Sequence, residues 1–192
     1  MKLLDVKRCD WVSGELHTKY HDTEWGVPLH NDRKLFEFLV LDSMQSGLSW
    51  QMILRKRKSF RDAFDNFDPK KISQYSKNDV RRLLADKGII RNRKKIESVI
   101  NNAEKFLLIK NEFGKFDSYV WSFVNHKTRI NYFKKWNDIP AISEESELMS
   151  KDMKKRGFTF VGPTVCYAFM QTVGMVNDHV MGCFRRKELK EF

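Results

Sequence analysis

Apolar residues recur along this chain mostly at intervals of three and four positions, the spacing of one face of an α-helix. The segment 32–45 shows this clearly, with Leu35 and Phe38 on one stripe and Asp32 as the expected N-cap. Only residues 157–162 alternate like a strand, and a lone strand cannot form a sheet. The pattern therefore predicts an all-α fold, with further helices at 49–64, 68–75, 76–88, 92–109, 116–126, 143–157 and 162–175.

Capping and stop residues set the expected helix ends. Ser76 and Asp79 are spaced as a capping box, and Gly88 is the expected end of that helix. Asp117 is the expected cap of the helix that follows residue 115. Pro163 opens the last predicted segment, which is almost entirely apolar and is expected to be the central buried helix.

One position breaks the apolar stripe of residues 32–45. Asp42 falls seven residues after Leu35 and therefore on the same helix face. Burying an unpaired charge is expensive, so this carboxylate should have a partner. The sequence leaves three kinds open: a neighbouring donor, an ion or a ligand.

The composition is that of an ordinary globular protein. With 192 residues, 41% of them hydrophobic, we expect a single domain over residues 1–192. No apolar run reaches the ~20 residues that a membrane span needs, and the first residues do not read as a signal peptide. We therefore expect a cytoplasmic protein without a membrane partner.

The charge is strongly positive, with 36 Lys and Arg against 25 Asp and Glu and a net charge of +11. A basic surface of this size favours nucleic acid or another polyanion as partner. The excess is clustered at residues 55–58, 91–95, 154–156 and 185–187. Any one cluster is most simply a solvated face, but four of them favour nucleic acid.

Four Cys and His residues form a candidate metal site. His179 and Cys183 are four apart, which on a helix would put both on one face, and Cys9 and His21 offer a second pair. Such a set would hold Zn²⁺ in a closed tetrahedral site, structural in role. The spacing also fits ordinary core or surface residues, and other histidines could substitute, namely His17, His30 and His126.

Residues 83–96 predict a helix, a tight turn at Gly88 and a new helix starting near Arg91. A helix–hairpin–helix of this kind points backbone N–H groups at a phosphate, and Arg91 and Lys94 would add charge. The alternative is a plain turn between two helices, with Ile89 and Ile90 in the core.

Four aromatic residues gather near Asp42 in the first fifty positions: Trp11, Tyr20, Trp25 and Trp50. Core packing would explain them. Flat rings around a buried carboxylate also describe a pocket for a planar, electron-poor ring, which would stack on them while the acid accepts hydrogen bonds from its edge.

At these residues the chain resembles the bacterial 3-methyladenine DNA glycosylase I family. The resemblance runs in order from Arg8 to Cys183 and is carried by seven motifs: RCDWV, YHDTEWGVP, QSGLSW, GIIRNRKKI, VWSFVNH, KKRGFTFVGPT and NDHVMGC. It implies an all-α helix–hairpin–helix glycosylase, the hairpin lying near residues 79–107, that excises 3-methyladenine by monofunctional hydrolysis. The family lacks the catalytic Asp found after the hairpin in other such glycosylases, and FLLIKN, residues 106–111, agrees.

The resemblance also implies roles for particular residues. The catalytic acid falls on Asp42, the base-binding aromatics on the four named above, and the ligands of one structural Zn²⁺ on Cys9, His21, His179 and Cys183. We expect the hairpin to bind DNA through Gly88, Ile89, Ile90, Arg91 and Lys94, and Leu48 to wedge into the duplex. The expected partners are double-stranded alkylated DNA and the free 3-methyladenine product, with the protein a monomer in the bacterial cytoplasm, at the nucleoid when bound to DNA.

The chain departs from the family pattern beside the acid. The family's residue is a glutamate, and Asp42 is one methylene shorter, which moves the carboxylate back by about 1.5 Å. Ser43 and Met44 stand where the family carries Gly and Gln, and the loop from Cys9 to His21 is one residue shorter. Two alternatives to an active hydrolase therefore stay open: a catalytically weakened binder of alkylated DNA or modified bases, and a zinc-stapled DNA-binding regulator without a base pocket.

Overall fold

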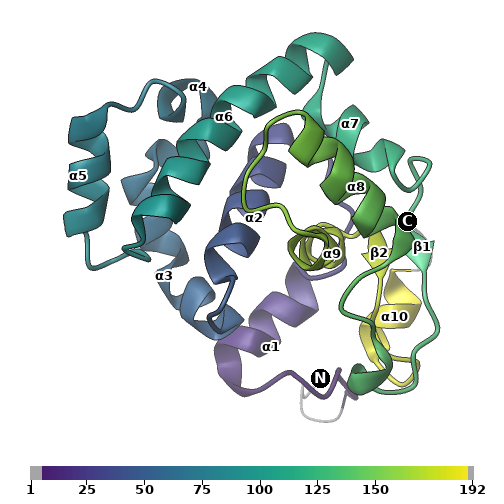
Figure 1. Ribbon diagram of the computed structural model, residues 1–192. Helices are drawn as coiled ribbons and strands as arrows, with labels where there is room; N and C mark the ends of the chain where they lie inside the picture. Colours follow the sequence, from purple (N-terminus) through teal and green to yellow (C-terminus); the bar gives the residue numbers. More distant parts are fainter. Residues whose placement is uncertain (1–5, 190–192) are drawn as a thin grey trace.

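The computed structural model describes residues 6–189. Within that range the fold is almost entirely helical (Figure 1), as predicted. The helices are α1 Gly14–Thr23, α2 Asp32–Gln45, α3 Trp50–Ala63, α4 Pro69–Ile72, α5 Lys77–Ala85, α6 Arg93–Phe113, α7 Phe116–Ser122, α8 Glu144–Lys155, α9 Pro163–Thr172 and α10 Phe184–Glu188, with short 3₁₀ helices η1 Asp65–Phe67 and η2 Trp136–Asp138. The prediction of a domain over 1–192 includes residues 1–5 and 190–192, which lie outside the described residues.

The one pair of strands among residues 6–189 does not involve residues 157–162, the segment that alternates like a strand. β1 Arg129–Ile130 and β2 Val176–Asn177 form a two-residue parallel pair, whereas residues 157–162 form a loop. The backbone of that loop bonds to a helix side chain, because Thr159 N donates to Asn102 Oδ1 (2.9 Å) and Asn102 Nδ2 donates to Thr159 O (2.9 Å). The alternating pattern was therefore misleading, since no neighbouring strand takes up these groups.

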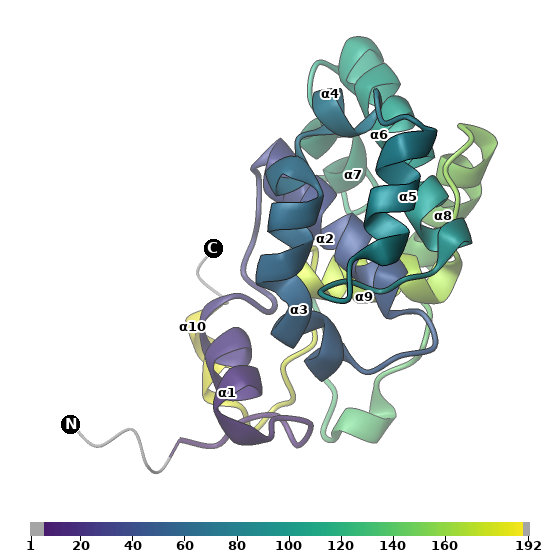
Figure 2. The same cartoon turned by 90° about the vertical axis from the view of Figure 1, so that its left-hand side faces the viewer.

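Helix α9 is the centre of the molecule, as its apolar sequence predicts. Figure 1 shows it end-on, with α1, α2 and α8 around it. Cys166, Phe169 and Met170 on this helix are fully buried. Helices α5 and α6 lie on the far side of α3 from α1 (Figure 2), so the predicted DNA-binding turn is remote from α1.

Several helix ends differ from prediction for local reasons. Asn31, not Asp32, caps α2, since its side chain accepts from Lys34 N. Asp32 instead accepts from the N–H of Asp117 at 3.0 Å, which ties α2 to the first turn of α7. Asp117 is therefore not the cap of α7; that position is Lys115.

Other ends follow the sequence. The capping box of Ser76 and Asp79 is present at the start of α5. That helix ends at Ala85, however, three residues before Gly88, which lies within the following turn. Helix α6 begins at Arg93 with Asn92 as its cap, one residue after the predicted start of the segment 92–109.

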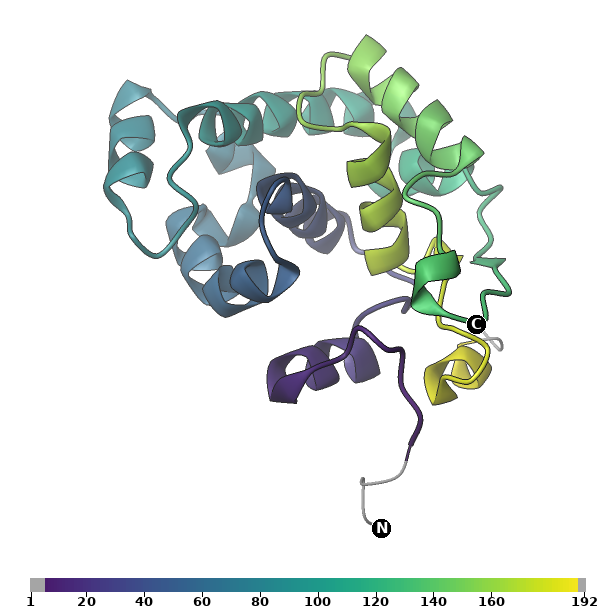
Figure 3. The same ribbon diagram turned by 60° about the horizontal axis from the view of Figure 1, so that its bottom comes forward.

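The two ends of the described chain meet. Helix α1, which the sequence analysis does not predict, contacts α10 through the rings of His21 and Phe184, whose centroids are 6.2 Å apart. Figures 2 and 3 both show these two helices at the same end of the molecule. No helix among residues 6–189 has the length and apolar character needed to cross a membrane.

Candidate active site and metal cluster

A cavity of about 270 Å³ is lined by residues of α1, α2, α3, η2 and α9. Figure 3 shows the arrangement of α1, α2, α3 and α9 with the bottom of the molecule turned forward. All four predicted aromatics and Asp42 line it. Its other lining residues are His17, Gln45, Trp136, Ala168, Gln171 and Thr172. The fold therefore brings the four predicted aromatics and Asp42, which come from three helices and two loops, to one cavity.

Asp42 is the buried acid of this cavity. Its side chain is almost fully enclosed, and Oδ2 has no hydrogen-bond partner. Burial raises the pKa of this carboxyl well above its usual value, and the positive charge of Arg57 opposes that effect only in part. Arg57 is itself engaged by Glu24 and Glu37, at 2.6 and 2.7 Å. The protein surroundings of Asp42 therefore disfavour its ionised form.

The neighbours of Asp42 that differ from the family pattern do not line the cavity. The Ser43 hydroxyl donates to the carbonyls of Leu39 (2.7 Å) and Phe160 (3.1 Å), which fixes the 157–162 loop against α2. Met44 is fully buried in the core. The two differences from the family pattern, at Ser43 and Met44, therefore affect the packing of α2 and not the lining of the cavity.

The aromatic rings surround the space in front of Asp42. The centroids of Tyr20 and Trp50 are 5.4 Å apart, and those of Trp11 and Trp25 are 5.2 Å apart in an edge-to-face arrangement. The Tyr20 hydroxyl is fixed by donation to Thr172 Oγ1 at 3.2 Å. The rings thus form a rigid apolar lining with stacking faces of the size of a purine.

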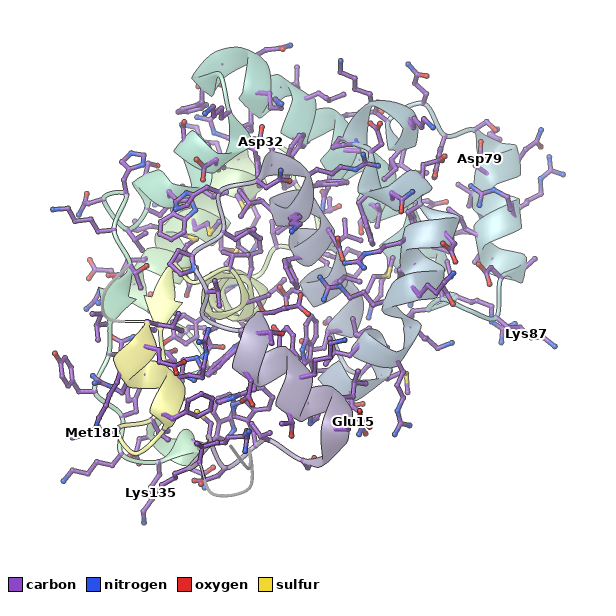
Figure 4. The ribbon with its side chains drawn as sticks, turned by 180° about the vertical axis from the view of Figure 1, so that it is seen from behind. Glu15, Asp32, Asp79, Lys87, Lys135 and Met181 are labelled. Atoms are coloured by element: carbon purple, nitrogen blue, oxygen red, sulfur yellow. The ribbon has the colours of Figure 1, made fainter. Side chains whose placement is uncertain are left out.

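Trp136 completes this lining and was missed by the sequence analysis. Its ring centroid is 6.0 Å from that of Trp11 and 6.2 Å from that of Trp25. The segment that carries it has no helical or strand pattern, so the sequence offered no signal. A contact with a distant part of the chain holds the segment that carries Trp136, because Met181 N donates to Phe133 O at 2.9 Å. Figure 4 shows Lys135 and Met181 near each other at the same end of the molecule.

The four predicted metal ligands come together in a second site. One ligand atom from each of Cys9, His21, His179 and Cys183 lies within 4.8 Å of the others, and all four residues are buried. Cys183 Sγ is 3.3 Å from His21 Nε2 and 3.5 Å from His179 Nδ1. The group could hold a metal ion. None of the substitutes His17, His30 and His126 belongs to it.

The route by which His179 and Cys183 meet differs from the prediction. They do not share a helix face; His179 lies in an irregular segment, residues 181–182 form a turn, and Cys183 is the N-cap of α10. The turn is closed by Cys183 N donating to Val180 O at 2.8 Å. The spacing of four residues was therefore informative although the assumed helix was wrong.

Outer hydrogen bonds orient both imidazoles of the cluster. His21 Nδ1 donates to Asp22 Oδ1 at 2.7 Å, and Asp22 is held in turn by Arg8. His179 Nε2 donates to the carbonyl of Trp25 at 3.1 Å. With these partners each imidazole presents its other nitrogen to the cluster, the arrangement usual for metal-bound histidine.

The thiols and the aromatic wall are linked to this cluster. The pKa of the Cys183 thiol lies far below its usual value, chiefly because the Cys9 thiol donates a hydrogen bond to its sulfur. The His179 ring is 4.5 Å from the ring of Trp25, and the His21 ring is 5.5 Å from that of Trp11. The cluster therefore lies directly behind the wall of the cavity.

The turn between α5 and α6 presents basic side chains. Arg91 and Lys94 are exposed, whereas Ile89 is buried and Ile90 packs partly against the core. Only the backbone of Ile89 can therefore contact a ligand. Lys87, in the same turn, projects from the edge of the molecule in Figure 4.

Gly88 is required by close packing in this turn. A Cβ at that position would lie 2.8 Å from the Cβ of Ser59 on α3. Gly88 N also donates to Asp86 Oδ1 at 2.7 Å, which closes the turn.

The turn that carries Leu48, between α2 and α3, is hydrogen-bonded to α6, the helix that follows the basic turn. Leu48 is 37% exposed at the end of α2, after Gly47 with φ +77°. Lys95 on α6 donates through Nζ to the carbonyls of Met44 (2.8 Å) and Ser46 (2.6 Å). The basic turn and the Leu48 turn therefore have a fixed relative position.

Together the fold and the site define a class of protein: a helical protein with an aromatic, base-sized cavity containing a buried acid, backed by a Cys/His cluster. A family model described as methyladenine glycosylase matches residues 11–186. The chain belongs to this methyladenine glycosylase family.

Relatives agree over nearly the whole length. The chain is 47% identical to DNA-3-methyladenine glycosylase 1 of Escherichia coli over 179 residues, covering 93% of this chain and 96% of the relative. A crystal structure of a 3-methyladenine DNA glycosylase I matches with a TM-score of 0.90 and 47% identity, covering 93% of this chain and 98% of the other. A tyrosine-to-phenylalanine variant of such an enzyme in complex with 3-methyladenine also matches, with a TM-score of 0.90 and 32% identity, covering 93% and 97%.

Proposed function

We propose that this protein is a DNA repair enzyme that flips 3-methyladenine out of alkylated double-stranded DNA and hydrolyses its N-glycosidic bond. The observation that carries the proposal is Asp42, a buried acid without a hydrogen-bond partner at Oδ2, inside a cavity lined by aromatic rings. The names of the similar proteins, and the bound 3-methyladenine in one of them, support the same activity.

The chemistry of the substrate suits a site with so few polar groups. Methylation at N3 makes the adenine cationic, so the glycosidic bond is weakened before the enzyme acts and the leaving group needs no proton. The enzyme has to flip the base, hold it and admit water. Stacking on Trp11 and Trp50 would recover part of the cost of unstacking, which is smallest for a damaged pair.

Asp42 supplies the electrostatic part of this proposal. Burial penalises its ionised form in the empty cavity, and a positively charged base offers the missing counter-charge. In the transition state the positive charge moves onto the sugar, where the same carboxylate stabilises the oxocarbenium-like centre. Catalysis would then depend on how close the carboxylate lies to the base and sugar.

DNA binding is assigned to the two linked turns. We propose that α5 and α6 form a helix–hairpin–helix in which the backbone around Gly88 to Ile90 binds a phosphate, with Arg91 and Lys94 adding charge. Leu48 is the apolar wedge that fills the gap left by the flipped base. The fixed link through Lys95 supports a joint action of both turns.

We further propose that the Cys/His cluster holds one structural Zn²⁺. Two thiolates and two imidazoles are ligands that zinc prefers, and a closed set of four leaves no position for substrate. The ion would join residues near both ends of the chain and fix the wall formed by Trp11 and Trp25. We propose a monomeric single domain, and we place it in the bacterial cytoplasm because the similar proteins are DNA-3-methyladenine glycosylases of Escherichia coli and Haemophilus influenzae.

The direct test is to incubate the protein with DNA methylated by a methylating agent and to quantify the released bases. We expect release of 3-methyladenine without strand cleavage, since no lyase step is proposed. Tight binding of free 3-methyladenine without release would instead indicate the weakened binder that the shorter Asp42 leaves open. Absence of both release and binding would contradict any role for the cavity in base recognition.

A further inference from the structure

Four buried polar atoms without a hydrogen-bond partner belong to residues that line the cavity: Trp11 Nε1, His17 Nε2, Asp42 Oδ2 and Trp50 Nε1. The two indole N–H groups can only donate, and the acid is the expected partner of the base. His17 is the one among them that the proposed mechanism does not use.

Nε2 is the ring nitrogen of His17 that has no hydrogen-bond partner in the protein. Nδ1 lies 3.4 Å from Ser13 Oγ, and the ring packs edge-to-face on Trp11 with centroids 5.7 Å apart. Burial, and to a smaller extent the positive charge of Arg55, lower the pKa of His17, so the imidazole is neutral at pH 7. A neutral imidazole with its proton on Nδ1, shared with Ser13, offers Nε2 as an acceptor.

We propose that His17 is a specificity-determining residue, which accepts a hydrogen bond from the exocyclic amino group of the flipped 3-methyladenine and thereby selects adenine over guanine. The inference rests on the proposed function. The amino group of adenine carries two N–H donors, and Asp42 and His17 are two acceptors lining the same cavity. Guanine carries a carbonyl oxygen at that ring position, which would face two acceptors and leave both unpaired.

His17→Phe is the informative variant, because it should not harm the fold. Phenylalanine keeps a ring against Trp11 and removes a buried nitrogen that has no partner in the protein. Its melting temperature should equal or exceed that of the wild type. His17→Gln restores an acceptor, and His30→Phe is a matched control, since His30 lies outside the cavity and pairs with Asp117.

The test measures kcat/KM for release of 3-methyladenine and 3-methylguanine from methylated DNA by the full-length protein and these variants. We expect His17→Phe to lower kcat/KM for 3-methyladenine about tenfold without lowering it for 3-methylguanine. His17→Gln should recover most of the loss, and His30→Phe should match the wild type. An unchanged ratio of the two substrates in His17→Phe would overturn the proposal.

A second measurement separates this inference from the proposed function. If the wild type releases no base, the proposed function fails, and calorimetric binding of free 3-methyladenine and free 3-methylguanine then tests His17 alone. A preference for 3-methyladenine that falls about tenfold in His17→Phe supports the residue's role. A preference unaffected by the substitution, or no preference in the wild type, rejects it.

Discussion

His21 Nε2 lies 3.3 Å from Cys183 Sγ, although 162 residues separate the two in the chain. The contact joins α1 to the N-terminus of α10, and with Cys9 and His179 it makes a buried group of four soft and borderline ligands. Since Trp25 and Trp11 pack on these imidazoles, the wall of the cavity depends on the same junction.

Loss of the metal should therefore affect stability first. Cys183→Ala is expected to abolish the single zinc ion per chain and to lower the melting temperature by about 10 °C, because a buried thiolate ligand and the clip between the chain ends are removed together. Elemental analysis and thermal unfolding measure the two effects. Cys166→Ala is the matched control, since Cys166 is a buried free cysteine outside the cluster. Full zinc content in Cys183→Ala would show that the cluster is not the metal site.

The unpaired acid should cost stability in the empty protein. Burial raises the pKa of Asp42 well above 3.8, so above about pH 3.8 the folded chain retains a proton that the unfolded chain has released. The folded state is thus penalised increasingly as the pH rises toward the folded pKa. Asp42→Asn should raise the melting temperature at pH 7 by about 2–4 °C, or roughly 1 kcal/mol, and the gain should shrink as the pH falls toward 4. A variant less stable than the wild type at pH 7 would mean that the acid has a partner.

The wedge assigned to Leu48 can be tested against another exposed leucine. Leu48→Ala should lower single-turnover excision about tenfold and weaken binding to duplex DNA, because the gap left by the flipped base is no longer filled. Leu108→Ala removes a more exposed leucine on α6 and should change neither. If Leu48→Ala and Leu108→Ala had the same excision rate and the same affinity for duplex DNA, Leu48 would not be the wedge.

The turn between α5 and α6 should contribute to DNA binding through the charges of its basic side chains. Lys94→Ala is expected to reduce the slope of log K against log salt for duplex DNA by about 0.9, the contribution of one phosphate contact. Lys115→Ala removes an equally exposed lysine beyond the opposite end of α6, a helix about 30 Å long, and should leave the slope unchanged. Titrations at several salt concentrations give both slopes; identical slopes for Lys94→Ala and the wild type would place the DNA elsewhere.

Much of this arrangement could be predicted from residue spacing. Eight helices, the burial of Asp42 and the capping box at Ser76 follow from periodicity and capping chemistry, which are local. Residue types and spacing made Cys9, His21, His179 and Cys183 one candidate metal group, beside the alternative of ordinary core or surface residues, although the segment at His179 was expected to be helical. Both metal ligands and pocket aromatics come together in the structure as the resemblance implies.

What the sequence concealed depends on tertiary contacts. Helix α1 has a weak apolar pattern, because its two buried residues, Tyr20 and His21, are amphipathic or polar and line the cavity and the Cys/His cluster. Trp136 lies in an irregular loop whose position comes from distant contacts. His17 is a polar residue in a segment without a clear pattern, so only the folded structure shows that it lines the cavity and that its Nε2 is buried without a hydrogen-bond partner.

The central claim is that Asp42 acts on a flipped cationic base. The most direct measurement is the single-turnover rate of 3-methyladenine release from methylated duplex DNA by the wild type, Asp42→Asn and Asp42→Glu. We predict a loss of about 100-fold or more in Asp42→Asn, and in Asp42→Glu a rate at least equal to the wild type, since the longer side chain carries the carboxylate about 1.5 Å further toward the base. Release by Asp42→Asn at the wild-type rate would contradict the account.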